Sequence, residues 1–405
     1  MNESNQQNSA LKIQKISFWD AVSILVGTGI GAGIMSLAYG AKDAGFPVLV
    51  FWIVVAGLFT TISMLYIAEV TLRTKTPHQL SGLAYKYVGP IGSWIMFAAV
   101  FVNSLGALTA YTTGSGDVLA SLFGIPKIIG SLLFFIPAIL VIWFGLKILG
   151  AAEKIITIAM LFMVLLLILA TFFGPKIQMA YLSFFNISHA IPVFSLVIFT
   201  FIAQYTVPEL ARGLHHDAKK LPLAIIVGMG LTALLIILVP MAALGLTGPE
   251  HVTEVVTIAW ADALGQWAFF IANIFTLCAF MTSFWAIGGT LLTNIIDKFK
   301  FPSEWDLKYR LISLSIVTIP PFIVAYTDVI GFVEVLSITG SFAGAVMGIL
   351  PIMMLRKARK NSEREPEWSC GWIAHPLIQY TIIVLFVGAA TYTMLDLLHI
   401  LPSHW

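Results

Sequence analysis

Residues 19–41 restrict the possible folds of this chain more than any other stretch. They are apolar almost throughout, and about 20 apolar residues in a helix cross the hydrocarbon core of a bilayer. Gly27, Gly29, Gly31 and Gly33 lie in the middle of the stretch, and each interior glycine costs a helix roughly 1 kcal/mol relative to alanine. The pattern predicts a transmembrane helix that opens midway, where its freed N–H and C=O groups would bind a zwitterion or a small cation.

A second interpretation of the same glycines is plain helix packing. Gly27 with Gly31, and Gly29 with Gly33, form two overlapping GxxxG pairs, which let two helices approach closely without any break. The choice between a broken helix and a packing helix depends on the rest of the chain.

The composition indicates a membrane protein. Of the 405 residues, 59% are hydrophobic and 10% are charged, a balance that soluble domains do not have, and the net charge of +2 gives no reason to expect a nucleic-acid partner. We expect an all-α integral membrane protein whose surroundings are the lipid bilayer. Eleven apolar runs of spanning length follow one another, at residues 19–41, 48–72, 91–119, 128–149, 155–173, 190–210, 221–246, 263–296, 311–325, 329–355 and 377–398.

The basic residues test this count. With eleven spans, all but three of the 22 lysines and arginines fall on the side of the N-terminus, the exceptions being Lys42, Lys127 and Lys176. Basic residues collect on the cytoplasmic side of membrane proteins. We therefore expect a multi-pass protein of the cell (plasma) membrane with a cytoplasmic N-terminus and an extracellular C-terminus. Cys278, in an apolar run, and Cys370, in a charged loop, indicate no disulfide framework.

The sixth apolar run carries a second sign of interruption. Its later half contains Thr200, Gln204 and Tyr205 and then Pro208, which cannot donate a helical hydrogen bond. An ordinary helix that ends near Tyr205 is the alternative. The first and sixth runs, however, hold matching positions in two sets of five, and interrupted spans at matching positions are typical of inverted-repeat transporters. The resulting division is a cytoplasmic tail at 1–17, five-helix repeats at 18–173 and 174–355, and a loop with the eleventh helix at 356–405.

Five stretches of the chain resemble one family, the bacterial hydroxy- and aromatic-amino-acid permeases of the amino acid–polyamine–organocation superfamily. The resemblance implies a LeuT-type fold, with five helices plus five inverted helices plus one and with breaks in the first and sixth. It also implies amino-acid uptake coupled to a proton or sodium gradient. The stretches are GTGIGAGIMSLAYGAKDAGF from Gly27, YIAE from Tyr66, AYTTGSG from Ala110, VPEL from Val207 with KKLP from Lys219, and TSF from Thr282 with Ile287 and Gly288.

An amino-acid substrate would bind where the two interruptions meet. Its carboxylate needs donors, and the N-terminus of an outer half-helix offers free amides and a favourable dipole. Tyr111 would add a hydroxyl, with a tyrosine anchored at the outer interface as the alternative. The predicted donors are the amides of Thr28, Gly29, Gly31, Ala32 and Gly33, and the predicted acceptors for the ammonium group are the carbonyls of Ile202, Ala203 and Gln204.

Aromatic side chains near these breaks suggest the class of substrate. Phe199, Phe201 and Trp285 could form the walls of a pocket for a neutral, apolar or aromatic side chain. Aromatic residues that belong to the core or face lipid are the alternative.

A sodium ion would bind beside the first break. Thr282 and Ser283 are adjacent hydroxyls that could join the carbonyls of Gly27 and Ile30 in an all-oxygen site, unless they bond back to their own helix. The resemblance also implies an alternative, in which the ammonium group of a lysine in the middle of the fifth span takes the place of the sodium ion. In this chain Thr157, Ala159 and Met160 occupy that region, and Lys154 lies at the cytoplasmic end of the span. A lysine-based proton mechanism is therefore in doubt.

A proton carrier is the other possibility. Glu69 is a carboxylate within a span and so a candidate, although Arg73 lies one turn away and could pair with it. Asp117 and Glu334 are weaker candidates. The stretch His215, His216 and Asp217 has metal-ligand residue types but is expected to be a solvated loop.

Together these features predict a secondary active transporter that imports a neutral amino acid, aromatic or hydroxylated, by alternating access. The coupling ion would be H⁺ or Na⁺, and no other cofactor is expected. The chain shows no nucleophile–base pair, no phosphate loop and no ATPase motif, so we expect no enzyme. An amino-acid sensor or an exchanger on the same fold is the alternative, and a channel is a third possibility.

Overall fold

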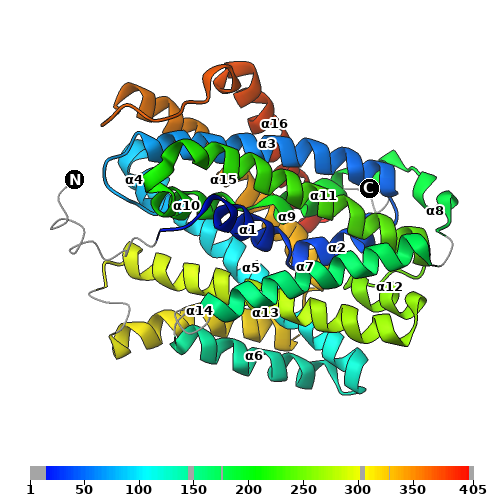
Figure 1. Ribbon diagram of the computed structural model, residues 1–405. Helices are drawn as coiled ribbons and strands as arrows, with labels where there is room; N and C mark the ends of the chain where they lie inside the picture. Colours follow the sequence, from blue (N-terminus) through cyan, green and yellow to red (C-terminus); the bar gives the residue numbers. More distant parts are fainter. Residues whose placement is uncertain (1–14, 145–149, 175–176, 302–305, 328, 401–405) are drawn as a thin grey trace.

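Long helices that run side by side make up the protein (Figure 1). The computed structural model describes residues 15–144, 150–174, 177–301, 306–327 and 329–400, and these residues form no strand. Residues 1–14 of the predicted tail, the last five residues of the predicted span 128–149 and the C-terminal residues 401–405 lie outside the described part.

The order of the helices follows the apolar runs of the sequence. The helices of the first half are α1 (Phe18–Gly29), α2 (Ala32–Gly40), α3 (Phe46–Leu72), α4 (Leu80–Val88), α5 (Pro90–Phe123), α6 (Lys127–Phe144) and α7 (Gly150–Phe173). Those of the second half are α8 (Met179–Ser183), α9 (Ala190–Phe201), α10 (Val207–Gly213), α11 (Leu221–Thr247), α12 (Val256–Leu264), α13 (Gln266–Lys298), α14 (Leu307–Thr327), α15 (Phe332–Lys360) and α16 (Pro376–Leu397).

Many of these helices can cross a membrane. By length and composition, eight helical segments of the described residues are long and apolar enough, and the bent pair α1 and α2 would make nine. Two shorter apolar segments, Lys127–Trp143 and Ile158–Phe173, lie within α6 and α7. An all-helical membrane protein is therefore the observed class, while the count of eleven spans stays a prediction.

One predicted loop is partly helical. The sequence pattern predicts a loop from Thr247 to Asp262, but α12 occupies most of its second half. Gly248 and Gly265 have positive φ angles of 76° and 101°, a conformation that favours glycine, and they separate α12 from α11 and α13. The two glycines thus turn the chain sharply enough for a short helix to fit between two long ones.

The backbone leaves the helical conformation between α1 and α2. The two helices meet at an angle of 44°, and Ile30 and Gly31 between them have non-helical dihedral angles. Close packing accounts for two of the neighbouring glycines, because a Cβ atom on Gly29 would lie 2.3 Å from Thr232 of α11, and one on Gly33 would lie 2.9 Å from the Thr200 backbone of α9.

A second departure from helical geometry lies between α9 and α10. Helix α9 ends at Phe201, Ile202 and Ala203 are non-helical, and a 3-10 turn at Gln204–Thr206 leads into α10. Pro208 lies in the first turn of α10, where its missing N–H costs nothing. The backbone therefore leaves the helical conformation at Ile202, six residues before Pro208. The proline begins the next helix and does not end the previous one.

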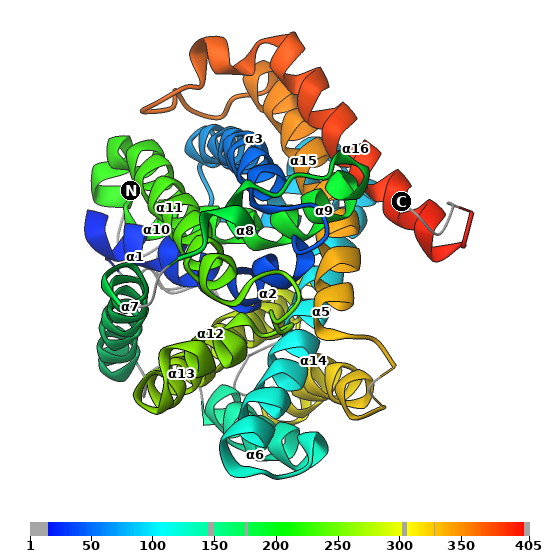
Figure 2. The same cartoon turned by 90° about the vertical axis from the view of Figure 1, so that its right-hand side faces the viewer.

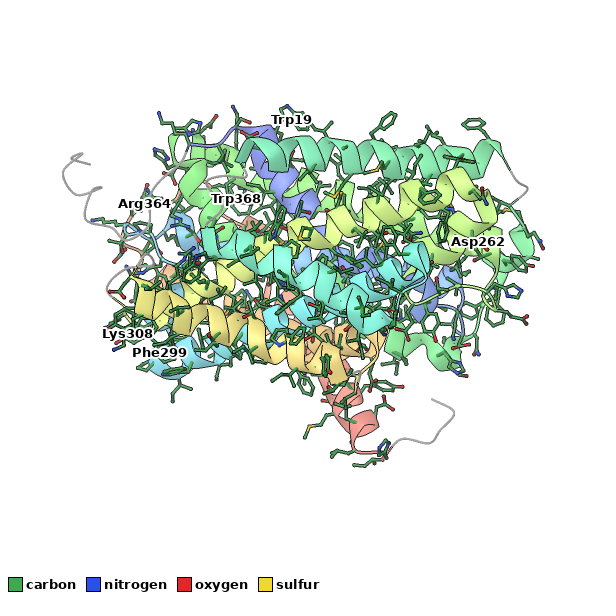
Figure 3. The ribbon with its side chains drawn as sticks, turned by 90° about the horizontal axis from the view of Figure 1, so that it is seen from below. Trp19, Asp262, Phe299, Lys308, Arg364 and Trp368 are labelled. Atoms are coloured by element: carbon green, nitrogen blue, oxygen red, sulfur yellow. The ribbon has the colours of Figure 1, made fainter. Side chains whose placement is uncertain are left out.

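Helix α9 lies in the interior of the bundle and positions the site. It packs against α2, α3 and α15. Seen end-on, α16 and α6 lie at opposite edges of the bundle (Figure 2). Lys308 and Arg364 lie at one end of the bundle and Asp262 at the other (Figure 3).

Candidate functional site

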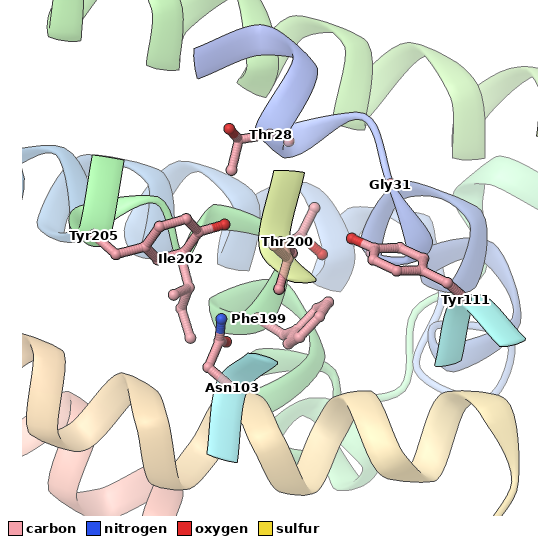
Figure 4. A pocket seen from close by; sticks show the side chains of 11 residues that line it. Thr28, Gly31, Asn103, Tyr111, Phe199, Thr200, Ile202 and Tyr205 are labelled. Atoms are coloured by element: carbon pink, nitrogen blue, oxygen red, sulfur yellow. The ribbon is translucent and has the colours of Figure 1, made fainter. Parts of the chain in front are cut away.

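The two departures from helical geometry face each other across a small cavity (Figure 4). Its volume is about 10 Å³, which is room for roughly one water molecule and not for an amino acid. The described conformation is therefore closed around the site. The residues that line the cavity are Thr28, Gly29, Gly31, Gly33, Asn103, Tyr111, Phe199, Thr200, Ile202, Tyr205 and Ile287.

The lining includes seven of the eleven residues predicted to bind substrate. They come from the end of α1 and the start of α2, from Tyr111 of α5, and from Phe199 and Ile202 at the end of α9. The other four predicted residues do not belong to it: Ala32, Ala203, Gln204 and Trp285.

Gly31 brings the cavity wall close to two hydroxyl groups. A Cβ atom on Gly31 would lie 2.8 Å from the hydroxyl oxygen of Tyr111 and 3.2 Å from Oγ of Ser283. Only 2% of Tyr111 is exposed, so its ring lies in the bundle interior and not at an outer interface. Its hydroxyl also lies near the N–H of Ala32.

The start of α2 offers hydrogen-bond donors at this point. Its N-cap residue is Gly31, which has no side chain to cap the first amides of the helix. The first N–H groups of a helix lack partners within the helix and form the positive end of its dipole. Although Ala32 does not line the cavity, its amide therefore belongs to a set of donors suited to a carboxylate.

The opposite side of the cavity supplies fewer acceptors than the sequence suggests. The carbonyl of Ala203 accepts from the N–H of Thr206 at 3.0 Å and from its hydroxyl at 2.7 Å, and the carbonyl of Gln204 accepts from Val207 N–H. Two of the three carbonyls predicted to bind an ammonium group are thus already hydrogen-bonded. The backbone makes these bonds because the chain winds into the 3-10 turn directly after Ala203.

Polar side chains that the sequence analysis missed also line the cavity. Asn103 of α5 is 2% exposed, and its Oδ1 has no hydrogen-bond partner among the described residues. Tyr205 and Thr200 line the cavity as well (Figure 4). Asn103 could have been found, since it lies two helical turns before Tyr111 and so on the same face of the helix.

Two further polar groups near the breaks are buried without partners. They are Nε2 of Gln204 and Nε1 of Trp285, each unpaired among the described residues. Oε1 of Gln204 accepts from the N–H of Ala203 at 3.1 Å. Burying an unpaired polar group is costly, so such groups suggest that a different conformation or a ligand completes their hydrogen bonds.

The residues predicted to bind sodium separate into two groups. The hydroxyl of Ser283 donates to the carbonyl of Ile30 at 3.4 Å. The hydroxyl of Thr282 bonds back to its own helix, to the carbonyls of Cys278 at 3.0 Å and Ala279 at 3.2 Å. Neighbouring residues of a helix point about 100° apart, so the two hydroxyls do not face the same place. A Cβ atom on Gly27, the fourth predicted residue, would meet nothing within 4 Å.

Glu69 lies outside the cavity lining, in a cluster of ionic contacts. Its fully buried carboxylate accepts from Arg73 Nε at 2.9 Å, from Arg359 Nε and Nη2 at 2.8 and 2.9 Å, and from the N–H of Cys370 at 2.7 Å. The pairing with Arg73 that the sequence suggested as an alternative is thus present, and a second arginine joins it.

The other titratable candidates also lie outside the cavity lining. Asp117 forms an ion pair with Lys127 at 3.2 Å, and Glu334 lies in the first turn of α15. Asp217 pairs with Lys220 at 2.6 Å, and the residues that the structure describes contain no group of side chains suited to a metal ion. The side chains of Lys154 and Thr157, where a superfamily lysine would be sought, lie outside the described part.

Known proteins resemble most of this chain. The sequence profile of the tryptophan/tyrosine permease family matches residues 14–394. Tyrosine-specific transport system 1 of Haemophilus influenzae is 26% identical over 358 residues, which are 83% of this chain and 87% of that protein. Cationic amino acid transporter 3, mitochondrial, of Arabidopsis thaliana is 24% identical, and the match covers 68% of this chain and 50% of the relative.

A solved structure shares the fold. Mhp1, a nucleobase-cation-symport-1 family transporter in a closed conformation with bromovinylhydantoin bound, superposes with a TM-score of 0.66 at 13% sequence identity, over 97% of both chains. This likeness concerns the fold alone, and it is consistent with the LeuT-type architecture that the family resemblance implies.

The family prediction is confirmed by these findings. The apolar helices and the permease family together make the chain a multi-pass membrane transporter and not an enzyme. This chain belongs to the tryptophan/tyrosine permease family.

Proposed function

We propose that this transporter imports a neutral aromatic amino acid into the cell, driven by a sodium gradient. The observation that carries the proposal is the cavity between the two helix interruptions, where the uncapped start of α2 lies beside Tyr111 and Ser283. The name of the tyrosine-specific relative supports an aromatic substrate.

The carboxylate of the substrate would bind at the start of α2. The amides of Ala32 and Gly33 and the hydroxyl of Tyr111 would donate to it, and the ammonium group would bind carbonyls at the end of α9, with Ile202 favoured over its two occupied neighbours. Thr28, Gly29 and Gly31 would form the wall between these two groups.

The side chain of the substrate would point towards Phe199, Ile202 and Ile287, which are apolar residues of the cavity lining. Asn103 and Tyr205 add polar atoms to the same lining, and they would suit a ring that carries a hydroxyl or an N–H group. Since the closed cavity holds about one water molecule, binding requires the helices around it to move apart.

The coupling ion would bind between α1 and α13. The hydroxyl of Ser283 and the carbonyl of Ile30 are the pair of oxygens that supports sodium, and the carbonyl of Gly27 would join them as a third ligand. A proton carried by Glu69 is the second candidate, but this carboxylate already accepts hydrogen bonds from two arginines and lies outside the cavity lining.

The proposed placement in the membrane follows the charges. We propose eleven spans in the plasma membrane, with α1 and α2 as an interrupted first span, α9 and α10 as an interrupted sixth, and repeats at 18–173 and 174–355. The end of the bundle that carries Lys308 and Arg364 would face the cytoplasm (Figure 3).

The test is uptake of labelled tyrosine, tryptophan and phenylalanine into proteoliposomes, with an imposed sodium gradient or an imposed proton gradient. Accumulation against a concentration difference supports an ion-coupled importer, and the gradient that drives it identifies the ion. Counterflow without accumulation would instead indicate an exchanger, and binding without counterflow a sensor.

A further inference from the structure

A second cavity lies between α4 and α15, away from the proposed substrate site. Its volume is about 300 Å³, far larger than the cavity between the helix interruptions. Tyr87 and Val88 at the end of α4 line one side, and Met353, Arg356 and Lys357 of α15 line the other. The lining thus combines two cationic side chains with apolar ones.

The two cations lack an anionic partner in the part of the chain that the structure describes. Among the described residues, no carboxylate forms an ion pair with Arg356 or Lys357. Arg356 is held in position instead by neutral groups: its Nε donates to Oε1 of Gln379 at 2.7 Å, and its guanidinium lies over the ring of Tyr380 at 5.8 Å. The cavity therefore has an excess of positive charge and one preoriented guanidinium group.

Basic residues at the end of a helix have an ordinary explanation, since they interact favourably with the helix dipole. Lys360 in the last turn of α15 fits that explanation, and Arg359 pairs with Glu69. Arg356 and Lys357 differ from both because they line a cavity. The dipole alone does not explain an open space beside them.

Exposed apolar side chains lie on the bundle next to this cavity. Met353, one turn before Arg356 and Lys357, is 45% exposed, and Tyr380 and Val384 of α16 are 57% and 69% exposed. In a membrane protein such side chains face the acyl chains of lipids. Along α15 an apolar position is thus followed by two cationic ones, which is the order in which a lipid presents its acyl chains and its phosphate.

We propose that this cavity binds the phosphate of an anionic phospholipid of the cytoplasmic leaflet. Arg356 and Lys357 would pair with the phosphate, and the acyl chains would pass over Met353 and Tyr380. Basic pockets between transmembrane helices on the cytoplasmic side are suited to such headgroups, and a guanidinium group can bind phosphate with two hydrogen bonds. The inference rests on the proposed placement in the membrane and not on the proposed transport.

Native mass spectrometry of the full-length protein, released from detergent with added lipid, tests this directly. Phosphatidylglycerol is compared with phosphatidylcholine, which has the same acyl chains and no net charge. We expect retention of phosphatidylglycerol by the unaltered protein, and binding weaker by on the order of 30-fold in the double variant Arg356→Gln, Lys357→Gln, because each basic group contributes about fivefold near a membrane. Lys360→Gln removes a charge from the same helix end outside the cavity and should leave binding unchanged.

Several results would overturn the proposal. Equal retention of phosphatidylcholine would show that the charges do not select the lipid, and an equal loss in Lys360→Gln would show that only the overall charge matters. Inorganic phosphate or glycerol phosphate that binds as tightly as the lipid would indicate a site for a free anion. If the unaltered protein forms a dimer, and the double variant is monomeric but binds lipid as before, the cavity would instead be a protein interface.

If the double variant does not fold, the single variant Lys357→Gln is tested in its place, because Arg356 then keeps its hydrogen bond to Gln379. We expect this variant to bind phosphatidylglycerol about fivefold more weakly. Unchanged lipid binding would overturn the proposal. The mass measurement needs no substrate. Failure of the transport proposal and failure of the lipid proposal are therefore distinguishable.

Discussion

The hydroxyl of Ser283 donates to the carbonyl of Ile30 at 3.4 Å, so that α13 contacts the chain at the residue where α1 gives way to α2. Gly31 follows directly, and the absence of a Cβ atom there leaves room for both Ser283 and Tyr111. One short piece of backbone thus joins the proposed ion site to the proposed carboxylate site. Binding of either ligand would change the position of the other's partners, which is a physical basis for coupling.

Gly31→Ala should abolish most of the uptake. Its Cβ atom would lie 2.8 Å from the Tyr111 hydroxyl, and such overpacking costs about 1–3 kcal/mol, equivalent to roughly 5- to 100-fold in binding. Gly230→Ala in α11 is the control, because its Cβ atom would meet nothing within 4 Å and Gly230 belongs to neither proposed site. The measurement is initial uptake of labelled tyrosine into proteoliposomes. Equal uptake by the two variants would show that the space at Gly31 is not needed.

Tyr111→Phe should weaken substrate binding while the protein stays folded. A hydrogen bond to a charged group contributes about 1.5–3 kcal/mol, so loss of the hydroxyl should raise the KM for tyrosine about 10- to 100-fold. Tyr85→Phe, which alters an exposed tyrosine of α4, should leave KM unchanged. A KM that does not change in Tyr111→Phe would remove this residue from the carboxylate site.

Asn103→Leu should alter selectivity more than stability. Its Oδ1 is buried without a partner, so its removal leaves no new unpaired group, and the melting temperature should not fall. A site that hydrogen-bonds a ring hydroxyl rejects the analogue that lacks it. The ratio of tyrosine to phenylalanine uptake, measured by competition, should therefore drop about tenfold or more. An unchanged ratio would place the substrate ring elsewhere.

Glu69→Gln separates a structural role from a proton-carrying one. The buried carboxylate holds two arginines and the N–H of Cys370, and removal of one partner of such a cluster typically costs about 3 kcal/mol. We expect a clear fall in the unfolding temperature in detergent, with the ion dependence of the remaining uptake unchanged. A variant of normal stability that has lost only proton-driven uptake would identify Glu69 as the proton carrier.

Local chemistry explains which features could be predicted from the sequence. The glycines around Gly31 and the apolar runs are properties of short stretches, and they indicated a departure from helical geometry at the position where the structure has one. The second departure was expected in the right segment, although Pro208 begins α10 and the change occurs earlier, at Ile202. Propensity alone does not distinguish a proline that ends a helix from one that begins the next.

Features that depend on three-dimensional packing could not be predicted in this way. Arg359 approaches Glu69 from 290 positions along the chain. Whether Thr282 or Ser283 faces α1 depends on the rotation of α13, which adjacent hydroxyls do not reveal. The occupied carbonyl of Ala203 likewise results from the 3-10 turn that follows it.

The most direct test compares sodium-driven tyrosine uptake in the unaltered protein and in Ser283→Ala, both reconstituted in proteoliposomes. We expect an inward sodium gradient to drive accumulation in the unaltered protein. In Ser283→Ala, tyrosine counterflow should persist while the sodium gradient no longer drives accumulation, because the ion has lost the hydroxyl that lies beside the Ile30 carbonyl. Sodium-driven accumulation that is unchanged in Ser283→Ala, or absent from the unaltered protein, would contradict the proposed coupling site.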